Sequence, residues 1–306
     1  MSPDLALAIP TPVRASLTDN PIDILRFAIA SFDRGPVALA TLIEIRGGAA
    51  RSLGAQMAIA GDGRFCGYVS GGCVEAAVAA EALQAMAEKR DRVVKFGEGS
   101  SFFDIVLPCG GGITIAIHVM KDARALEDVV RLNDRRVGAS LAYSPTSQSL
   151  RMETKSRAGW FDKTFRSSYL PRTRVVVSGQ AAEAQAVGQL ASASSYDVMQ
   201  VGTALTSCQL SEWIDSYTAV VLLHHDIDTE ADILETVLKS EAFYIGALGS
   251  TRTHHRRVER LKARSFNADE IARIKAPIGM FGPTRDVSSL ALSVLADVAA
   301  ARLGTH

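Results

Sequence analysis

The stretch Arg174-Val175-Val176-Val177-Ser178-Gly179 decides the fold of the second half of the chain, because it predicts a buried strand that ends at a glycine. An alanine-rich segment with strong helix propensity follows it to about residue 192. Further strands at 197–201, 219–223 and 243–245 alternate with helices at 229–239 and 252–262, before a last helix at 287–302. This alternation predicts right-handed βαβ units in a Rossmann-like, doubly wound parallel sheet.

The turn after that first strand lacks most of the glycines of a dinucleotide-binding fingerprint. Ala181 stands where the second glycine would let the backbone approach a pyrophosphate, and Val201-Gly202-Thr203 offers no acid for a ribose. The sequence therefore argues against a bound NAD(P). A Rossmann-fold NAD(P)-dependent oxidoreductase with a pyrophosphate site at Gly179 remains the alternative function.

Two other loops are expected at the carboxyl edge of the same sheet, where open α/β folds bind ligands. His224-His225-Asp226 follows the third strand and Gly246-Ala247-Leu248-Gly249-Ser250 ends the fourth. Adjacent histidines in an extended segment point to opposite faces, so only one can face a crevice. The predicted ligand-binding residues at this edge are His225, Gly249 and Ser250.

The first half of the chain predicts a mixed α+β domain. A helix begins at Pro21 and ends before Gly35, and strands are expected at 37–45, 56–60, 64–69, 93–96 and 113–120, with helices at 74–88 and 126–133. The stretch 139–154 indicates one more strand pair. Residues 145–171 are polar and broken by prolines, so the boundary is placed near Pro171, giving domains 1–170 and 171–306.

The turn Gly67-Tyr68-Val69-Ser70-Gly71-Gly72-Cys73-Val74-Glu75 joins a strand to a helix and predicts a ligand cradle. Glycines allow close backbone approach, and the free N–H groups of a helix start favour an anion. Cys73 is expected in the first helical turn, as a soft ligand or nucleophile, although a lone cysteine is often only a small buried side chain. A second such turn is Pro108-Cys109-Gly110-Gly111-Gly112.

Composition excludes several classes of partner. Lys plus Arg and Asp plus Glu number 33 each, so no net field draws the 306-residue chain to nucleic acid or an anionic membrane. Four cysteines without Cys-x-x-Cys spacing fit neither a zinc site nor a secreted disulfide scaffold. Neither a signal peptide nor a long uninterrupted apolar run is found, and a cytoplasmic protein is expected.

Several of these motifs, taken in order, resemble the xanthine dehydrogenase accessory protein family, XdhC/CoxI. The matching segments are Gly54-Ala55-Gln56-Met57, Gly71-Gly72-Cys73-Val74-Glu75, Cys109-Gly110-Gly111, Tyr244 to Thr253 and Pro277-Ile278-Gly279. The family's Gly-Ser-small-Pro-Arg loop reads Gly47-Gly48-Ala49-Ala50-Arg51 here, without the proline. The glycine-rich Rossmann turn and the Asp-Pro-Arg after the second strand are also degraded.

The resemblance implies a cytoplasmic chaperone, rather than an enzyme, that binds molybdenum cofactor (molybdopterin) transiently. Such a protein protects the cofactor while a cysteine desulfurase installs its terminal sulfur, and assists its insertion into a molybdenum hydroxylase apoenzyme of the xanthine dehydrogenase type. A homo-oligomer, for example a dimer, is expected. A third hypothesis is a protein whose second domain mainly dimerises or docks a partner through the apolar helix Leu290 to Leu303, although packing in the core is the more common use of such a helix.

This resemblance assigns no catalytic residue and predicts a single cofactor cradle. Its residues are Arg51, Gly71, Gly72, Cys73, Glu75, Cys109, Gly110 and Gly111, together with His225, Gly249 and Ser250 of the second domain. Arg51 is expected on the phosphate. Cys73 or Cys109 is expected near the metal, because soft thiolates suit it.

Overall fold

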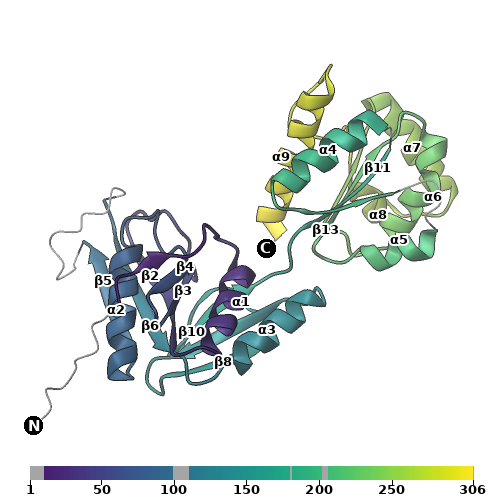
Figure 1. Cartoon of the computed structure of the whole chain (residues 1–306). Helices are drawn as coiled ribbons and strands as arrows, with labels where there is room; N and C mark the ends of the chain where they lie inside the picture. The colour runs from purple at the N-terminus through teal and green to yellow at the C-terminus, as the bar shows by residue number, and fades with distance from the viewer. Residues whose placement is uncertain (1–9, 99–109, 180, 202–205, 306) are drawn as a thin grey trace, which may run out of the picture. The chain divides into compact units, whose positions relative to one another are not determined.

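The computed structural model describes residues 10–98, 110–179, 181–201 and 206–305 (Figure 1). The chain divides into two compact units, Met1–Pro171 and Arg172–His306. Cys109, one of the two predicted metal-contacting residues, lies outside the described residues.

The first unit is built on a six-stranded sheet with both faces covered by helices. Its strand order is β1 (Val13–Arg14), β4 (Arg64–Gly67), β3 (Gln56–Ala60), β2 (Val37–Arg46), β6 (Gly112–Val119) and β5 (Arg92–Gly97). All pairs are antiparallel except β1 and β4. The helices are α1 (Pro21–Phe32), α2 (Glu75–Glu88) and α3 (Arg124–Asp134).

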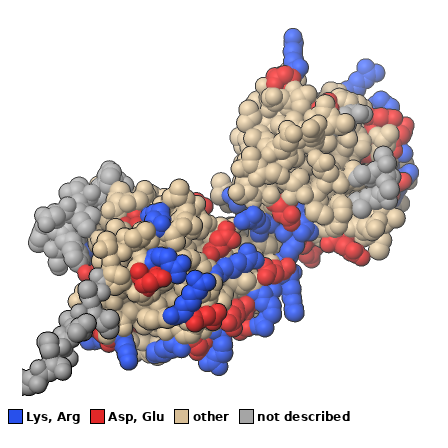
Figure 2. Space-filling model, in the orientation of Figure 1, with Lys and Arg blue, Asp and Glu red and all other residues tan. Residues whose placement is uncertain are grey.

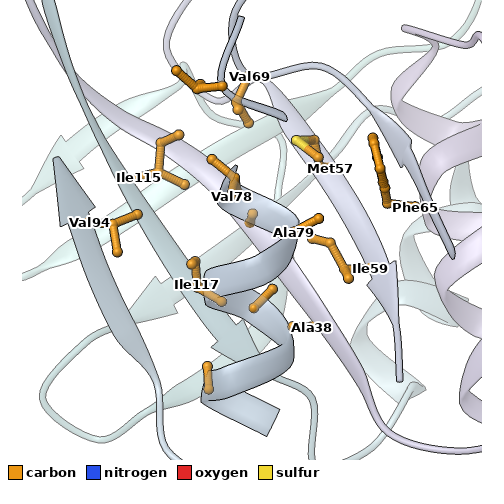
Figure 3. Packing of buried hydrophobic residues seen from close by; sticks show 14 of the residues in the cluster. Ala38, Met57, Ile59, Phe65, Val69, Val78, Ala79, Val94, Ile115 and Ile117 are labelled. Carbon is orange, nitrogen blue, oxygen red and sulfur yellow. The ribbon is translucent and has the colours of Figure 1, made fainter. Parts of the chain in front are cut away.

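Strand β2 shows why the sheet is covered on both sides. Alternate residues of a strand point to opposite faces. Ala38, Ala40 and Leu42 pack in the cluster that includes α2, and Figure 3 shows part of this cluster, with Val78 and Ala79 of α2 over the strands. Val37 and Leu39 pack in the opposite cluster with α1 and α3. Seven consecutive buried residues in β2 follow from this arrangement.

A second, antiparallel sheet completes the first unit, in the order β8 (Ser149–Thr154), β7 (Ala139–Ser144), β10 (Thr164–Tyr169) and β9 (Gly159–Phe161). Strands β9 and β10 lie in the polar stretch 145–171, where the sequence indicated only one strand. Phe165, Ser167 and Tyr169 of β10 are buried, whereas the residues between them are partly exposed. The stretch is therefore half-buried sheet.

One edge of the six-stranded sheet gathers the loops that carry the predicted cradle. Strands β2 and β4 both end there, because β3 runs antiparallel to each of them. Strand β6 begins at the same edge because it is antiparallel to β2. Strand pairing thus brings together the loops that follow β2 and β4 and the glycines that precede β6, although they are far apart in sequence.

The second unit is built on a parallel sheet, as predicted, but the sheet has five strands where the sequence indicated four. Its order is β12 (Asp197–Gln200), β11 (Arg174–Gly179), β13 (Thr218–Leu223), β14 (Tyr244–Ala247) and β15 (Ile274–Lys275). Helices α4 (Ala181–Ala193) and α9 (Val287–Thr305) cover one face. Helices α5 (Ser207–Trp213), α6 (Ile227–Leu238), α7 (Thr251–Ala263) and α8 (Ala268–Ala272) cover the other. The predicted α/β fold class is confirmed.

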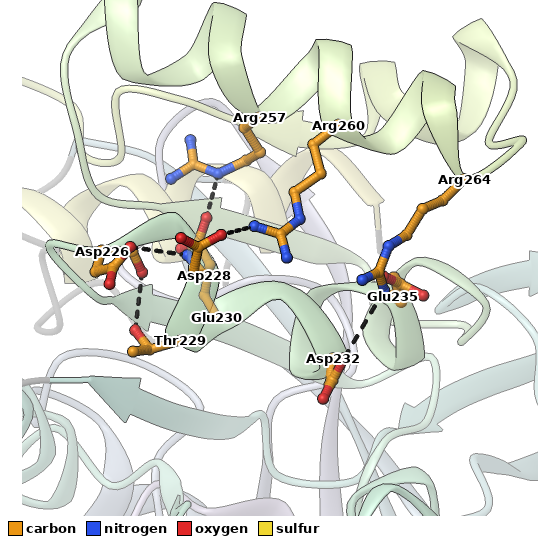
Figure 4. A network of polar contacts seen from close by, with 9 residues as sticks. All are labelled: Asp226, Asp228, Thr229, Glu230, Asp232, Glu235, Arg257, Arg260 and Arg264. Atoms are coloured by element: carbon orange, nitrogen blue, oxygen red, sulfur yellow. Dashed lines mark hydrogen bonds and ion pairs between the residues drawn. The ribbon is translucent and has the colours of Figure 1, made fainter.

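Helices α6 and α7 are joined by ion pairs, which Figure 4 shows along the facing sides of the two helices. Arg257 pairs with Glu230, and both side chains are at most 2% exposed. Arg257 also donates to the backbone carbonyl of Leu248 at 2.9 Å. The neighbouring pair Arg260–Asp228 lies nearer the surface, because the Asp228 side chain is 72% exposed.

Among the described residues, α9 alone is long and apolar enough to cross a membrane by length and composition. Ala291, Val294, Leu295 and Val298 of this helix are buried in the core of the second unit. One side of α9 therefore packs in the core of this unit, whereas Leu292 and Leu303 are exposed. Figure 2 shows acidic and basic side chains intermixed over the first unit, in agreement with the balanced composition.

Candidate functional site

The loop between β4 and α2 is hydrogen-bonded to a buried carboxylate. Glu75 is 1% exposed, and its side chain accepts hydrogen bonds from the backbone N–H groups of Val69 (3.2 Å), Ser70 (2.9 Å) and Val74 (3.2 Å). The Ser70 hydroxyl lies 2.9 Å and 3.0 Å from its two oxygens. A buried carboxylate that accepts several such bonds is well compensated for its lost hydration.

Ser70 extends this network to the exposed part of the loop. Its Oγ accepts from the N–H groups of Gly72 and Cys73, each at 3.2 Å. The backbone donors that the sequence assigned to an anion are thus used inside the loop. Glu75, predicted in the cofactor cradle, is buried under the loop and its carboxylate is hydrogen-bonded to the loop backbone, so its contact with a cofactor stays a prediction.

Cys73 lies on the surface of the loop, not in the first turn of the helix. Helix α2 begins at Glu75 with Val74 as its N-cap, so Cys73 precedes the cap. Gly71, Gly72 and Cys73 are all exposed. Cys66, in β4, is buried, and burial raises the pKa of its thiol to about 11. Of these two cysteines, only Cys73 is available to a ligand from solvent.

The loop that follows β2 lies against the cradle. A Cβ built on Gly71 would lie 3.4 Å from the Cβ of Ala50. Arg51 donates from Nε to the Ser70 carbonyl at 3.4 Å and from Nη1 to Asp19 at 3.0 Å. The predicted neighbours Arg51 and Gly71 are therefore brought together by the structure.

The glycines before β6 pack against that same loop. A Cβ on Gly111 would lie 2.4 Å from the carbonyl oxygens of both Arg46 and Gly48, so only glycine fits there. Gly111 is buried and therefore supports the loop, whereas Gly110 is exposed. The loop after β2 is thus in direct contact with the glycines before β6 on one side and with Gly71 on the other. The predicted cradle residues from Gly71 to Gly110 therefore lie along one edge of the sheet.

Arg14 belongs to this cluster and was missed in the sequence. Its Cζ lies 4.3 Å from the centroid of the Tyr68 ring, and the Cζ of Arg51 lies 5.1 Å from the same centroid. Arg14 reaches this place because β1 pairs with β4, with Arg14 opposite Phe65. A two-residue strand gives almost no periodicity, so only the pattern of charge beside an aromatic residue could have indicated it.

The carboxyl edge of the second unit places its predicted residues in separate local contacts. His225 is exposed and lies 3.2 Å, Nε2 to Oε1, from Glu183 of α4. Ser250 is the N-cap of α7, and its hydroxyl accepts from Thr253 N–H at 3.2 Å. His224 instead turns inward to the Ser178 hydroxyl at 2.8 Å, and burial lowers the pKa of its imidazole.

Gly179 has a structural explanation that does not involve a nucleotide. A Cβ on this residue would lie 2.5 Å from the backbone carbon and oxygen of Leu223. The glycine therefore permits close approach of β11 to β13. Among the described residues, no group of three or more His, Cys, Asp or Glu side chains could hold a metal ion.

Comparisons with known proteins match segments of both units. Residues 33–97 match the XdhC and CoxI family, and residues 175–298 match the XdhC Rossmann domain. The chain belongs to the XdhC and CoxI family.

Among its relatives, the molybdenum cofactor insertion chaperone PaoD of Escherichia coli (strain K12) is 47% identical over 296 residues, covering 95% of this chain and 92% of PaoD. The uncharacterized protein YqeB of the same organism is 24% identical, covering 86% of this chain and 43% of YqeB. A crystal structure of a xanthine dehydrogenase from Bacillus halodurans has a TM-score of 0.71 at 20% identity, covering 93% of this chain and 96% of that chain. This last match shows the fold.

The support of the loop by Glu75 gives a first prediction. Replacing Glu75 with Gln keeps the side-chain shape but removes the charge and turns an NH₂ group toward N–H donors. We expect the free energy of unfolding to fall by about 2 kcal/mol, measured by urea denaturation. Glu88→Gln in the same helix is the control, because Glu88 makes an exposed ion pair with Arg92. A Glu75→Gln variant as stable as the control would contradict the supporting role.

Proposed function

We propose that this protein is a chaperone that binds molybdenum cofactor at the exposed loop edge of its first unit. The observation that carries the proposal is the 47% identity to a molybdenum cofactor insertion chaperone over 95% of the chain. The site supports it chemically. An exposed, internally braced glycine loop with one accessible thiol suits a carrier that holds a ligand without transforming it.

The residues of the loop edge have distinct roles in this proposal. Gly71, Gly72 and Gly110 form an open backbone surface against which a flat pterin can lie. Arg51 binds the phosphate of the cofactor through its planar guanidinium group. Cys73 lies near the metal, whose sulfur ligands make it a soft centre compatible with a thiolate. His225, Gly249 and Ser250 are proposed as a contribution of the second domain to cofactor binding.

The proposal extends to the partners of the chaperone. A cysteine desulfurase supplies the terminal sulfur of the bound cofactor, and an apoenzyme of the xanthine dehydrogenase type receives it. The protein acts in the cytoplasm as a homo-oligomer. Of its two domains, 1–170 binds the cofactor and 171–306 is a Rossmann-like domain that contributes to the binding.

The exposure of Gly71, Gly72 and Cys73 supports transfer between partners, because a partner protein can reach a cofactor held at these residues.

Removal of the thiols tests the site. We expect Cys73→Ala combined with Cys109→Ala to weaken binding of molybdenum cofactor about tenfold, a change of about 1.4 kcal/mol, because a soft donor near the metal is lost. Binding is measured by equilibrium gel filtration with cofactor released from a molybdenum hydroxylase, followed by molybdenum and pterin analysis.

The control for this experiment is Cys208→Ala, since Cys208 is exposed but lies in α5 of the second unit. Equal cofactor binding by the double variant, the control and the wild type would remove the thiols from the proposal. Failure of the wild-type protein to bind the cofactor at all would overturn the proposed function itself.

A further inference from the structure

The ring of Tyr68 contacts two arginines that come from different parts of the first unit. Arg14 belongs to β1, and its Nη1 donates to the Gly67 carbonyl at 3.1 Å. Arg51 belongs to the loop after β2, and its Nε donates to the Ser70 carbonyl. The two guanidinium groups are thus hydrogen-bonded to backbone carbonyls on either side of Tyr68-Val69, with the Tyr68 ring in contact with both.

The charges of this arginine pair are little compensated by carboxylates. Arg51 has an ion pair with Asp19, but the Asp19 side chain is 67% exposed, and such surface pairs contribute little. For Arg14, the described contacts are the Gly67 carbonyl and the rings of Phe65 and Tyr68. Two nearby cations repel each other, and an anion accepting hydrogen bonds from both would relieve that repulsion.

The stacking also fixes how the two groups are presented. A guanidinium held over an aromatic ring keeps its planar fork in a defined orientation, so less side-chain entropy is lost when an anion binds. Arginine forks match the spacing of phosphate oxygens and bind them with two parallel hydrogen bonds. Arg51 of this pair lies next to Gly71. Its Nε donates to the carbonyl of Ser70, the residue before Gly71, and a Cβ on Gly71 would lie 3.4 Å from the Cβ of Ala50, the residue before Arg51.

We propose that Arg14, Tyr68 and Arg51 form one phosphate-binding subsite, which takes the phosphate group of the cofactor bound at the adjacent glycine loop. The assignment of the phosphate to the cofactor rests on the proposed function, whereas the affinity of the subsite for phosphate does not. Arg14 and Tyr68 are the new members of the site. Tyr68 acts as a positioning residue, because it orients both arginines.

The test measures binding of inorganic pyrophosphate to the full chain by isothermal titration calorimetry at low salt. We expect Arg14→Ala and Arg51→Ala each to weaken binding about tenfold. Arg14→Lys, which keeps the charge but loses the fork, should weaken it about threefold, and this variant keeps the test open if Arg14→Ala fails to fold. Tyr68→Phe should bind normally, whereas Tyr68→Leu should lose affinity.

Arg64→Ala is the matched control, because it removes the same charge from neighbouring β4. Arg64 pairs with Asp62 at 2.8 Å, and its Cζ lies 5.9 Å from the centroid of the Phe27 ring. Pyrophosphate binding that is unchanged in Arg14→Ala and Arg51→Ala, or reduced equally in Arg64→Ala, would overturn the subsite.

A second arm repeats the measurement with molybdenum cofactor in place of pyrophosphate. Parallel losses for both ligands support the cofactor phosphate as the occupant. Weaker pyrophosphate binding with unchanged cofactor binding would assign the subsite to a free phosphate compound and overturn that occupant. If the wild type binds pyrophosphate through Arg14 but no cofactor, the subsite is supported and the proposed function fails.

Discussion

Arg257→Ala is expected to lower the free energy of unfolding of the second unit by about 3–5 kcal/mol. The substitution leaves Glu230, which is fully buried, without its cation, and an unpaired buried charge is strongly destabilising. It also removes the hydrogen bond to the Leu248 carbonyl at the start of the Gly249–Ser250 turn. Urea denaturation followed by circular dichroism measures the loss.

This loss should depend on pH in a defined direction. Burial, opposed by Arg257, raises the pKa of Glu230 above its usual value, and removing Arg257 raises it further. A folded state with a raised carboxyl pKa binds a proton more tightly than the unfolded state, so stability increases as the pH falls. The destabilisation should therefore be full when the pH is above the raised pKa of Glu230. It should become smaller as the pH falls toward the pKa of an ordinary glutamate.

The control is Arg260→Ala, which breaks the more exposed pair with Asp228 and should cost less than about 1 kcal/mol. Replacing both buried partners, with Arg257→Met and Glu230→Leu, should be less harmful than Arg257→Ala alone. A single Arg257→Ala variant no less stable than Arg260→Ala would contradict the account.

Gly111→Ala is expected to disrupt the cradle edge. The new Cβ would lie 2.4 Å from two carbonyl oxygens, so the loop at 46–48 must move away from the glycines before β6. We expect a loss of about 2–3 kcal/mol in stability and, because Arg51 follows that loop, about a hundredfold weaker cofactor binding. Denaturation and equilibrium gel filtration measure the two effects.

Gly110→Ala provides the comparison for that variant. Gly110 has φ +69°, but its Cβ would meet no heavy atom of the described residues within 4 Å, so the expected cost is only the roughly 1 kcal/mol of a left-handed backbone. Cofactor binding should change little. Equal binding by Gly111→Ala and Gly110→Ala would show that contact between the two loops does not hold the cradle.

Regular periodicity made much of the fold predictable. Strand β3 has the predicted bounds, 56–60, and α2 begins one residue after its predicted start. The parallel sheet of the second unit could be predicted from the alternation of apolar strands with helices, because the apolar pattern of each strand or helix is visible within a short stretch of sequence. Strand β10 could also have been predicted, since Phe165, Ser167 and Tyr169 alternate, but the polar residues between them obscured the pattern.

The candidate site was predictable in place but not in the roles of its residues. Exposed Gly71, Gly72 and Cys73 lie where the glycine turn indicated. The inward direction of Glu75 depends on a backbone conformation that the sequence alone does not specify, and a carboxylate in a first helical turn usually faces solvent. Arg14 joins the site through pairing of β1 with β4, a contact between residues 51 positions apart that no local pattern reveals.

The most direct test of the account is transfer of cofactor to an acceptor enzyme. The purified protein is loaded with molybdenum cofactor, separated from free cofactor, and incubated with a cofactor-free molybdenum hydroxylase of the xanthine dehydrogenase type, whose activity is then measured. The account predicts faster and more complete activation than with the same amount of free cofactor, and loss of this advantage in Gly111→Ala. Activation no better than with free cofactor would contradict the proposed chaperone function.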